Sequence, residues 1–327
     1  MTRLVGGTVA MVAAVGVFLA FVGTGSAAFP GKNGRITMQV VGFAHRSFTV
    51  DIGIVAPAGN GFRLLTRHRP EKAQSSFASW SPDGKRLAFD VRRSRGGSEI
   101  WVMNADGSGK RLVAGGRHRT VYDLSPFWVN ENLIVFSRFD GNGPTSIWEV
   151  RADGVGTARA LISAPPDTSL DSPAVSPNGK WILVTETTAT GSRLGLAGSD
   201  GAGLHVIPRT ARLDATGGDF SPNGRWIVTA NNATNGKVSS LVVLHPNGRG
   251  AHRITFAGKH RYNDLYPVWS PDGTKVAFSR SPCPHPAGGC PFAHIAIWVV
   301  NARGGGAHAI TSSSDTREYL APDWGRR

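Results

Sequence analysis

Three short basic triplets are the residues best suited to chemistry in this 327-residue chain. They read Arg-His-Arg at 67–69 and 117–119 and Lys-His-Arg at 259–261, and an aspartate follows the last two. Arginine forks match carboxylate and phosphate groups, so the triplets could frame a site for an anionic ligand. The alternative is solvated loop charge together with salt bridges inside each repeat. The candidate ligand-binding residues are His68, Arg69, His118, Arg119, Asp123, His260, Arg261 and Asp264.

Motifs of known catalytic chemistry are missing from the sequence. It contains no G-x-S-x-G elbow, no HExxH, no P-loop and no dinucleotide fingerprint. Ser172, Ser176 and Ser221 read as turn or strand residues rather than as nucleophiles. We therefore expect no cofactor and no catalytic residue.

The first 28 residues are typical of a secretory signal peptide. Arg3 is followed by an apolar stretch from Leu4 to Val22, and Ser26-Ala27-Ala28 fits the small-x-small rule for cleavage before Phe29. An uncleaved anchor is the alternative, although glycines weaken the apolar stretch. We expect residues 1–28 to be removed and residues 29–327 to form one secreted or periplasmic domain that has no transmembrane span.

Cys283 and Cys290 are the two cysteines, and both lie in the segment from Ser281 to Pro291. Two close cysteines in an exported chain predict one disulfide. The prolines and glycines between them can turn the chain back to the Cα separation of about 4.4–6.8 Å that a disulfide needs. The alternative is a zinc site that adds His285 or His294, but the paired CxxC spacing of structural zinc is missing.

The net charge of +14 limits the kinds of partner that the protein could bind. A basic surface could bind nucleic acid, anionic lipid or an anionic wall polymer. Alternatively, the arginine excess reflects a GC-rich coding sequence spread thinly over the surface. Export argues against genomic DNA, and the basic residues lack the aromatic interleaving of single-strand binders. We expect a monomer that binds a protein or an anionic cell-envelope polymer.

The sequence contains an internal repeat, in which a turn is followed by an apolar strand. In this motif proline presets the first turn position and glycine takes a positive φ. Its copies are Trp80–Phe89, Val175–Val184, Phe220–Thr229 and Trp269–Phe278, with a worn copy at Trp128–Ser137. A second motif, an apolar strand that ends in a polar-Gly turn, follows each first one. Its glycines are Gly59, Gly107, Gly154, Gly201, Gly248 and Gly304, at steps of 48, 47, 47, 47 and 56.

Six units of this length with four short strands each predict an all-β, six-bladed β-propeller with no helix after the signal. The first unit lacks its own turn strand and begins at Gly31–Val40, whereas the chain ends on Arg317–Gly325, which resembles the missing strand. The C-terminal strand should therefore complete the first blade, with Trp324 in the place that Trp80 and Trp269 hold. The last step, of 56 residues, is about nine residues longer than the others. The cysteine segment, inserted between the second and third strands of the last unit, accounts for this excess.

The repeats resemble the WD40-like Pro-Asp repeats of the TolB family of β-propellers. The resemblance is most specific in Ser81–Gly84, Ser270–Gly273 and Asn104–Gly107, and it covers about residues 31–325. The third blade has lost the Ser-Pro-Asp-Gly turn, and two blades carry Ser-Pro-Asn-Gly. The resemblance implies a non-enzymatic binding or scaffold module. Because some related propellers are metal-dependent and use channel histidines, a metal-dependent lyase or hydrolase acting on an anionic saccharide is the alternative.

Overall fold

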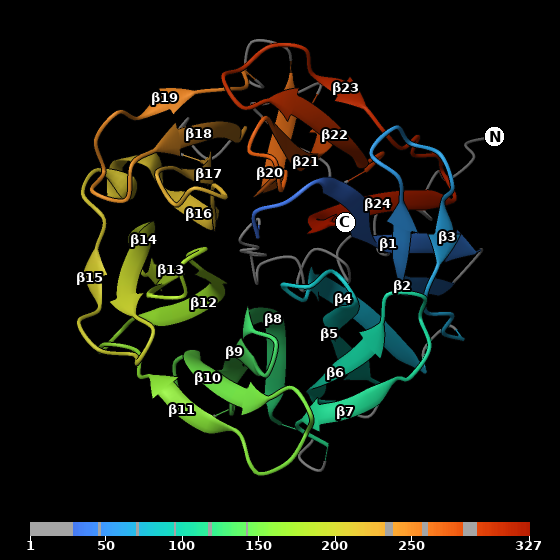
Figure 1. The fold of residues 1–327 in the computed structure, drawn as a ribbon, viewed down its shortest axis with the longest axis horizontal. Coiled ribbons are helices and arrows are strands. Elements are labelled where there is room, and N and C mark those ends of the chain that lie inside the picture. The colour runs from blue at the N-terminus through green and yellow to red at the C-terminus, as the bar shows by residue number, and fades with distance from the viewer. Residues whose placement is uncertain are drawn as a thin grey trace, which may run out of the picture.

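The structure, a computed structural model, describes residues 29–44, 47–69, 72–94, 96–116, 120–141, 143–232, 238–256, 261–283 and 293–327. Within these ranges the chain forms six antiparallel sheets of four strands, which stand around a central axis as the blades of a propeller (Figure 1). We call the strands of each blade A to D, from the innermost to the outermost. The expected all-β, six-bladed fold is confirmed.

The first three blades contain the closure of the ring. Blade 1 has A strand β24 (Arg317–Arg326), then β1 (Asn33–Ala44), β2 (Ser47–Val55) and β3 (Arg63–Leu64). Blade 2 is β4 (Ala73–Trp80), β5 (Arg86–Arg93), β6 (Ser98–Asn104) and β7 (Arg111–Ala114). Blade 3 is β8 (Tyr122–Asn130), β9 (Leu133–Phe139), β10 (Ser146–Arg151) and β11 (Arg159–Ile162). A single parallel bridge between Ser98 and Tyr122 links blades 2 and 3.

The last three blades repeat the same order without a break. Blade 4 is β12 (Ser169–Val175), β13 (Trp181–Thr188), β14 (Gly191–Gly198) and β15 (His205–Val206). Blade 5 is β16 (Ala215–Phe220), β17 (Ile227–Asn231), β18 (Ser240–Leu244) and β19 (His252–Arg253). Blade 6 is β20 (Tyr262–Trp269), β21 (Lys275–Pro282), β22 (Ala296–Asn301) and β23 (His308–Ala309).

One short helix contradicts the expectation that no helix follows the signal. The 3₁₀-helix η1 (Thr210–Leu213) joins blades 4 and 5. Arg209 and Asp214 flank it in the left-handed conformation. The Thr210 hydroxyl donates to the Ile207 carbonyl at 2.7 Å and accepts the Leu194 N–H at 3.1 Å, so a buried threonine ties this turn to strand C.

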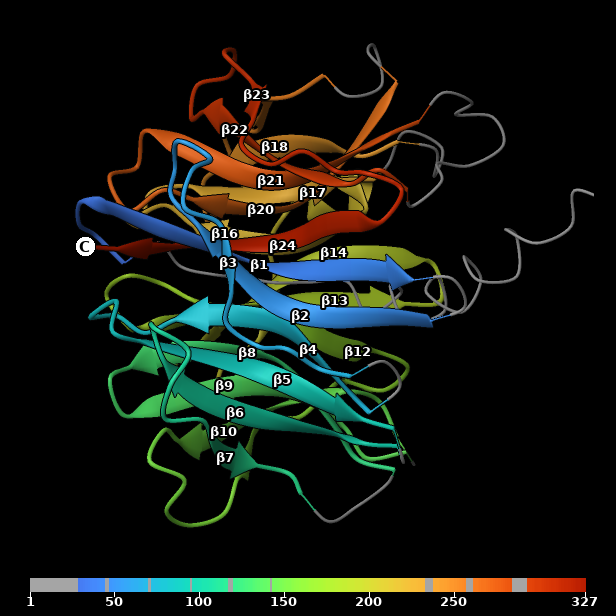
Figure 2. The same ribbon diagram turned by 90° about the vertical axis from the view of Figure 1, so that its right-hand side faces the viewer.

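Closure follows the predicted route. Strand β24 pairs with β1, and Trp324 lies opposite Ile36. Trp80, Trp269 and Trp324 are all buried, at 6 %, 4 % and 3 % exposure. Figure 2 shows β24 lying alongside β1 within blade 1. Because each apolar cluster draws residues from neighbouring blades, the core lies between the sheets rather than in the central channel.

Every A strand bends at the same point, three residues before its anchor. A residue with positive φ stands there, and the A–B pairing shifts register beside it. This arrangement is a β-bulge. The six residues are Phe77 (46°), Ser125 (51°), Ser172 (56°), Gly217 (55°), Tyr266 (54°) and Ala321 (47°).

The bulge turns a backbone N–H out of its own sheet toward strand B of the preceding blade. In four blades a side chain there accepts it. The bonds are Ser125 N to Asp90 Oδ1 (3.3 Å), Ser172 N to Ser137 Oγ (3.2 Å), Gly217 N to Thr185 Oγ1 (3.0 Å) and Ala321 N to Ser279 Oγ (2.9 Å). We call this contact the inter-blade latch.

A second set of bonds crosses the seams at the anchors. Asp323 Oδ2 accepts the Trp80 N–H at 2.6 Å, and Asp219 Oδ2 accepts the Trp269 N–H at 2.6 Å. The Trp128 indole donates to the Ser79 carbonyl at 3.1 Å. The aromatic anchors are therefore packing residues that join blades.

The closure bond yields a first prediction. Asp323→Ala removes the acceptor of the buried Trp80 N–H and should lower the free energy of unfolding by about 1–3 kcal/mol. Urea unfolding followed by tryptophan fluorescence measures this change. Asp315, whose side chain is 94 % exposed, supplies the control, and Asp315→Ala should change stability by less than about 0.5 kcal/mol. Equal stability of the two variants would contradict a role for Asp323 in closure.

The latch yields a second prediction. Burial raises the pKa of Asp90 to about 7. The folded protein keeps a proton that the unfolded chain releases near pH 4, so this carboxyl makes stability fall from about pH 4 to about pH 7 and adds no slope above that. Asp90→Asn keeps the acceptor oxygen and removes the charge. We expect the variant to be more stable than the parent at pH 8 and equal to it at pH 4.

Thermal unfolding at both pH values, with Asp315→Asn beside it, checks the second prediction. A stability difference between Asp90→Asn and the parent that is the same at pH 4 and pH 8 would show that Asp90 does not titrate in this window.

Candidate binding face

The propeller has two unlike faces. Strands A and C end at one face, where the short A–B and C–D turns lie, and we call it the turn face. The B–C connections and the D–A connections, which lead from each blade to the next, lie at the other face, the loop face (Figure 2). The candidate ligand residues that the structure describes come from the D–A connections or from the first residues of the A strands, so they belong to the loop face.

His68 ties the first D–A loop to its surroundings. Its N–H donates to Asp51 Oδ1 at 2.9 Å, and its Nε2 lies 2.6 Å from Ser75 Oγ. Burial is the largest cause that lowers the pKa of His68, outweighing the attraction of Asp51. The neighbouring Arg67 and Arg69 are exposed. His68 therefore positions the loop as a neutral group, while the arginines on either side face solvent.

Asp123 and Asp264 are committed to partners inside their own blades. Asp123 accepts Arg138 Nε and Nη2 at 2.6 and 2.7 Å, and Asp264 accepts Arg280 Nε and Nη2 at 2.6 and 2.8 Å. Both aspartates are fully buried. Burial raises the pKa of each carboxyl, although its arginine opposes the shift. These pairs are the repeat-internal salt bridges that the sequence analysis gave as the alternative to a ligand site.

Aromatic rings cover both arginines, of which Arg280 is buried and Arg138 is partly exposed. The Arg138 guanidinium lies 4.3 Å from the Trp148 ring centroid, and that of Arg280 lies 4.8 Å from the centroids of Tyr262 and Trp298. Stacking and bidentate pairing together offset the cost of burying the charge. Arg138 and Arg280 thus belong to the framework beneath the loop face.

The remaining candidates are only partly placed. Arg261 is exposed, and its carbonyl accepts the Cys283 N–H at 2.6 Å. His118, Arg119 and His260 lie outside the described residues, so their part in a site stays a prediction. Cys283 is buried directly after β21. Cys290 also lies outside the described residues, and the disulfide stays a prediction.

The described residues bear on the zinc site and on a membrane span. Within the described ranges, no three His, Cys, Asp or Glu side chains gather as metal ligands would. His294, one of the alternative ligands, donates its N–H to Glu318 Oε1 at 2.7 Å, and His285 lies outside the described residues. No helix in the described part of the chain is long and apolar enough to cross a membrane.

The sequence analysis does not identify the two acids whose pKa rises to about 7. Burial raises the pKa of Asp171, beside the bulge of β12, to about 7, as it does for Asp90. Such shifts are common at functional sites but also occur in structural networks. Asp90 holds the latch. The sequence does carry a pattern that points to this role. The strand B position of Asp90 is occupied by the hydroxyl residues Ser137, Thr185 and Ser279 in three other blades, so a hydrogen-bond acceptor recurs there.

Comparison with known proteins places the fold. A family profile described as the TolB beta propeller domain matches residues 69–261, more than half of the chain. A curated relative, the Tol-Pal system protein TolB of Anaeromyxobacter dehalogenans, is 32 % identical over 91 residues, which is 28 % of this chain. The match spans only 19 % of the relative's length.

Solved structures agree with this assignment at the level of the fold. TolB from Acinetobacter baumannii superposes with a TM-score of 0.70 at 14 % identity, covering 95 % of this chain and 70 % of that one. An oligogalacturonate lyase in complex with manganese superposes with a TM-score of 0.53 at 11 % identity, covering 86 % and 74 %. The profile match, with six four-stranded blades closed by β24, shows that the chain belongs to the TolB beta-propeller family.

Proposed function

We propose that this protein is an extracytoplasmic, non-enzymatic binding module whose loop face takes an acidic segment of a partner protein. Membership in the TolB propeller family supports a scaffold role. The curated relative is named for a multi-protein system, which favours a protein partner. An anionic cell-envelope polymer is the other ligand that the same charge would accept.

The observation that carries the proposal is that three acids beneath the loop face are already occupied by partners inside the protein. Asp51 is buried and accepts the Thr66 hydroxyl at 2.9 Å as well as the His68 N–H. Asp123 and Asp264 are neutralised by Arg138 and Arg280. These three carboxylates therefore point inward, and they leave the exposed Arg67, Arg69 and Arg261 to attract an anionic partner.

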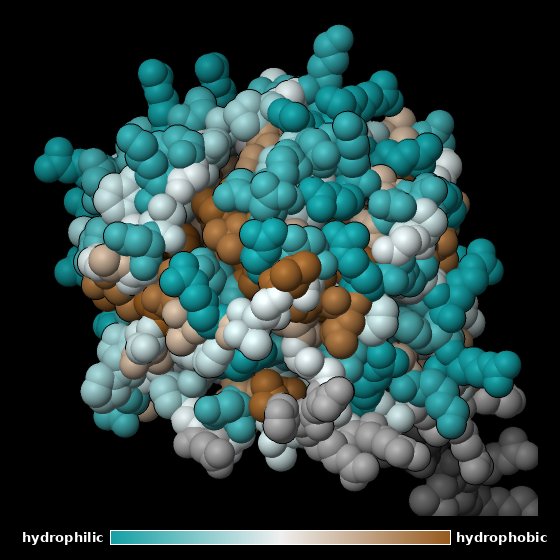
Figure 3. Space-filling model, turned by 60° about the horizontal axis from the view of Figure 1, so that its bottom comes forward, coloured by the Kyte–Doolittle hydropathy of each residue, from teal (hydrophilic) through white to brown (hydrophobic). Residues whose placement is uncertain are grey.

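The surface fits a polar partner. On the side of the molecule that Figure 3 shows, hydrophilic residues dominate and apolar residues form separate small groups. Large exposed apolar side chains in the described ranges include Leu112, Val155, Trp181 and Phe256. They come from blades 2, 3, 4 and 5, so electrostatic rather than apolar contacts should dominate recognition.

Export gives a third prediction. Intact protein recovered from outside the cytoplasm should begin at Phe29 and should weigh two hydrogens less than its reduced form, because Cys283 and Cys290 are joined. Mass spectrometry with and without a reductant measures both features. A chain that retains residues 1–28 would favour the anchor, and bound zinc released on thiol modification would favour the metal alternative.

The loop face gives a fourth prediction. A fluorescent poly-glutamate peptide should bind the parent protein at low salt, and Arg69→Gln with Arg261→Gln should weaken binding by about threefold to tenfold and flatten its salt dependence. Fluorescence anisotropy measures both effects. The matched control is Arg249→Gln with Arg303→Gln, which removes the same charge from exposed C–D turns on the turn face.

The outcomes separate the candidate functions. Equal weakening in both double variants would reduce the effect to net charge and contradict a loop-face site. Binding of a glycerol phosphate oligomer, but not of the peptide, would point to the polymer. Stoichiometric bound metal in the purified protein would favour the lyase or hydrolase alternative.

A further inference from the structure

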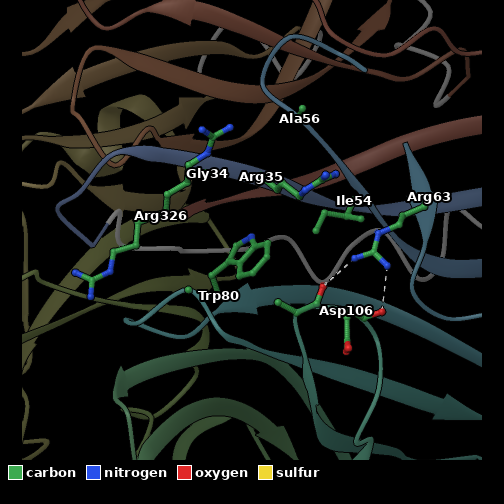
Figure 4. A pocket seen from close by; sticks show the side chains of 11 residues that line it. Gly34, Arg35, Ile54, Ala56, Arg63, Trp80, Asp106 and Arg326 are labelled. Atoms are coloured by element: carbon green, nitrogen blue, oxygen red, sulfur yellow. Dashed lines mark hydrogen bonds between the residues drawn. The ribbon is translucent and has the colours of Figure 1, made fainter. Parts of the chain in front are cut away.

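A second basic site lies on the turn face, at the seam between blades 1 and 2. A hollow of about 390 Å³ opens there, and four arginines contribute to its lining. We call it the arginine hollow. Figure 4 shows Arg35 and Arg63 on one side of the Trp80 indole and Arg326 on the other. The full lining is Gly34, Arg35, Ile54, Ala56, Arg63, Trp80, Gly84, Ala105, Asp106, Arg326 and Arg327.

Backbone carbonyls position three of these arginines. Arg63 Nη1 and Nη2 donate across the seam to the carbonyls of Asp106 (3.2 Å) and Ala105 (3.4 Å). Arg35 Nη1 donates to the Gly61 carbonyl at 3.3 Å, and Arg326 Nη1 donates to that of Pro30 at 3.3 Å. Each guanidinium has five donors, so these bonds orient the groups and leave donors for a ligand.

The positive charge of the hollow is not balanced. Among the described residues, none of the four arginines forms an ion pair with a carboxylate. Asp106 is the one acid in the lining, and its carboxylate accepts the Ser108 N–H and hydroxyl at 2.8 and 2.6 Å. Four positive and one negative side chain sum to +3, and the terminal carboxylate of Arg327 lowers the formal charge to +2, which an anion would relieve.

Two other seams of the same ring do not repeat this unpaired charge. The residue equivalent to Arg35 in blade 2 is Arg86, which lies 3.6 Å from the Glu131 carboxylate and 4.8 Å from the Trp128 ring centroid. In blade 4 it is Trp181, which lines a hollow of about 380 Å³ together with His205 and no arginine or lysine. The repeat thus provides the hollow, and blade 1 makes it basic.

Tight backbone packing fixes the floor of the arginine hollow. Gly84 has a φ of +70°, and a β-carbon there would lie 2.5 Å from the Arg326 carbonyl oxygen. At Gly325 a β-carbon would lie 2.5 Å from the Trp80 ring. The Trp80 Nε1 has no hydrogen-bond partner in the described residues, and the same is true of Trp269 and Trp324 at other seams. This unpaired indole is therefore not specific to the hollow, and the arginines are the feature that points to a ligand.

We infer that the arginine hollow binds a phosphate-type oxyanion. Guanidinium groups match phosphate oxygens, and a formal charge of +2 favours a dianion over a single carboxylate. The shared chemistry is a phosphoryl group, which could arrive as free phosphate or within a phosphodiester polymer. The site does not rest on the loop-face proposal, because its residues lie on the opposite face.

Isothermal titration of the whole protein with inorganic phosphate, pyrophosphate and a glycerol phosphate oligomer tests the inference, with sodium acetate at equal ionic strength as the comparison. We expect saturable binding of at least one phosphate probe. Arg35→Gln with Arg326→Gln should weaken it at least about tenfold, which corresponds to about 1.4 kcal/mol. Arg249→Gln with Arg303→Gln and Arg69→Gln with Arg261→Gln should each stay within about twofold of the parent, because these sites lie elsewhere.

The probes also distinguish the source of the phosphoryl group. Binding of inorganic phosphate or pyrophosphate supports a site for the free anion, and binding of the oligomer alone supports a phosphodiester ligand. No saturable binding of any phosphate probe would overturn the inference. Acetate binding as strong as phosphate binding, or equal losses in all three double variants, would also overturn it. Unfolding temperatures of the variants show that each one is folded.

Discussion

Hydrogen bonds from the inner strand of one blade to its neighbour are the contacts on which the ring depends. The inter-blade latch spans four seams, and the Asp323–Trp80 and Asp219–Trp269 bonds span the other two. A left-handed residue outside glycine costs on the order of 1–3 kcal/mol, yet five of the six A strands accept it at Phe77, Ser125, Ser172, Tyr266 and Ala321. The bulge frees an N–H that strand B of the neighbouring blade accepts, as at Ala321 and Ser279. Buried packing between the blades must offset the strain, which ties the conformation of each inner strand to the presence of its neighbour.

This dependence explains where polar groups are buried. Asp90, Ser137, Thr185 and Ser279 occupy one position of strand B and share one task. Hydroxyls perform it without charge, whereas Asp90 performs it as a buried carboxyl whose pKa rises to about 7. The Asp–Arg pairs of blades 3 and 6 fill a different layer, near the start of the A strands, where aromatic rings exclude water from them. In blade 3 the latch at Ser125 and the Asp123–Arg138 pair act on the same inner strand.

Much of this could be predicted from the sequence, because the repeat carries it. Glycine spacing gave the blade count, and the strand at Arg317–Gly325 gave the closure. The bulge could not be predicted, since Phe77 and Tyr266 have no intrinsic preference for positive φ and adopt it only under tertiary contact. Asp123 and Asp264 follow the basic triplets closely in the sequence, which places them among the loop residues of a predicted ligand site. They lie inside β8 and β20, directly opposite Arg138 and Arg280, and a sequence without known strand bounds does not fix that cross-strand register.

The arginine hollow shows why a closed repeat can acquire a site at one seam without disturbing the fold. The latch and the anchors lie on strands A and B toward the core, whereas the lining position represented by Arg35 varies freely among Arg86, Trp181 and Lys275 in other blades. A substitution there changes the chemistry of one hollow and leaves the backbone of all six blades in place. Blade 1 differs further because β24 brings Arg326 and Arg327 beside Arg35, across a sheet built from distant parts of the chain. The closure that completes the ring therefore also concentrates positive charge at its own seam, and this seam is where a ligand would act back on the stability of the closed state.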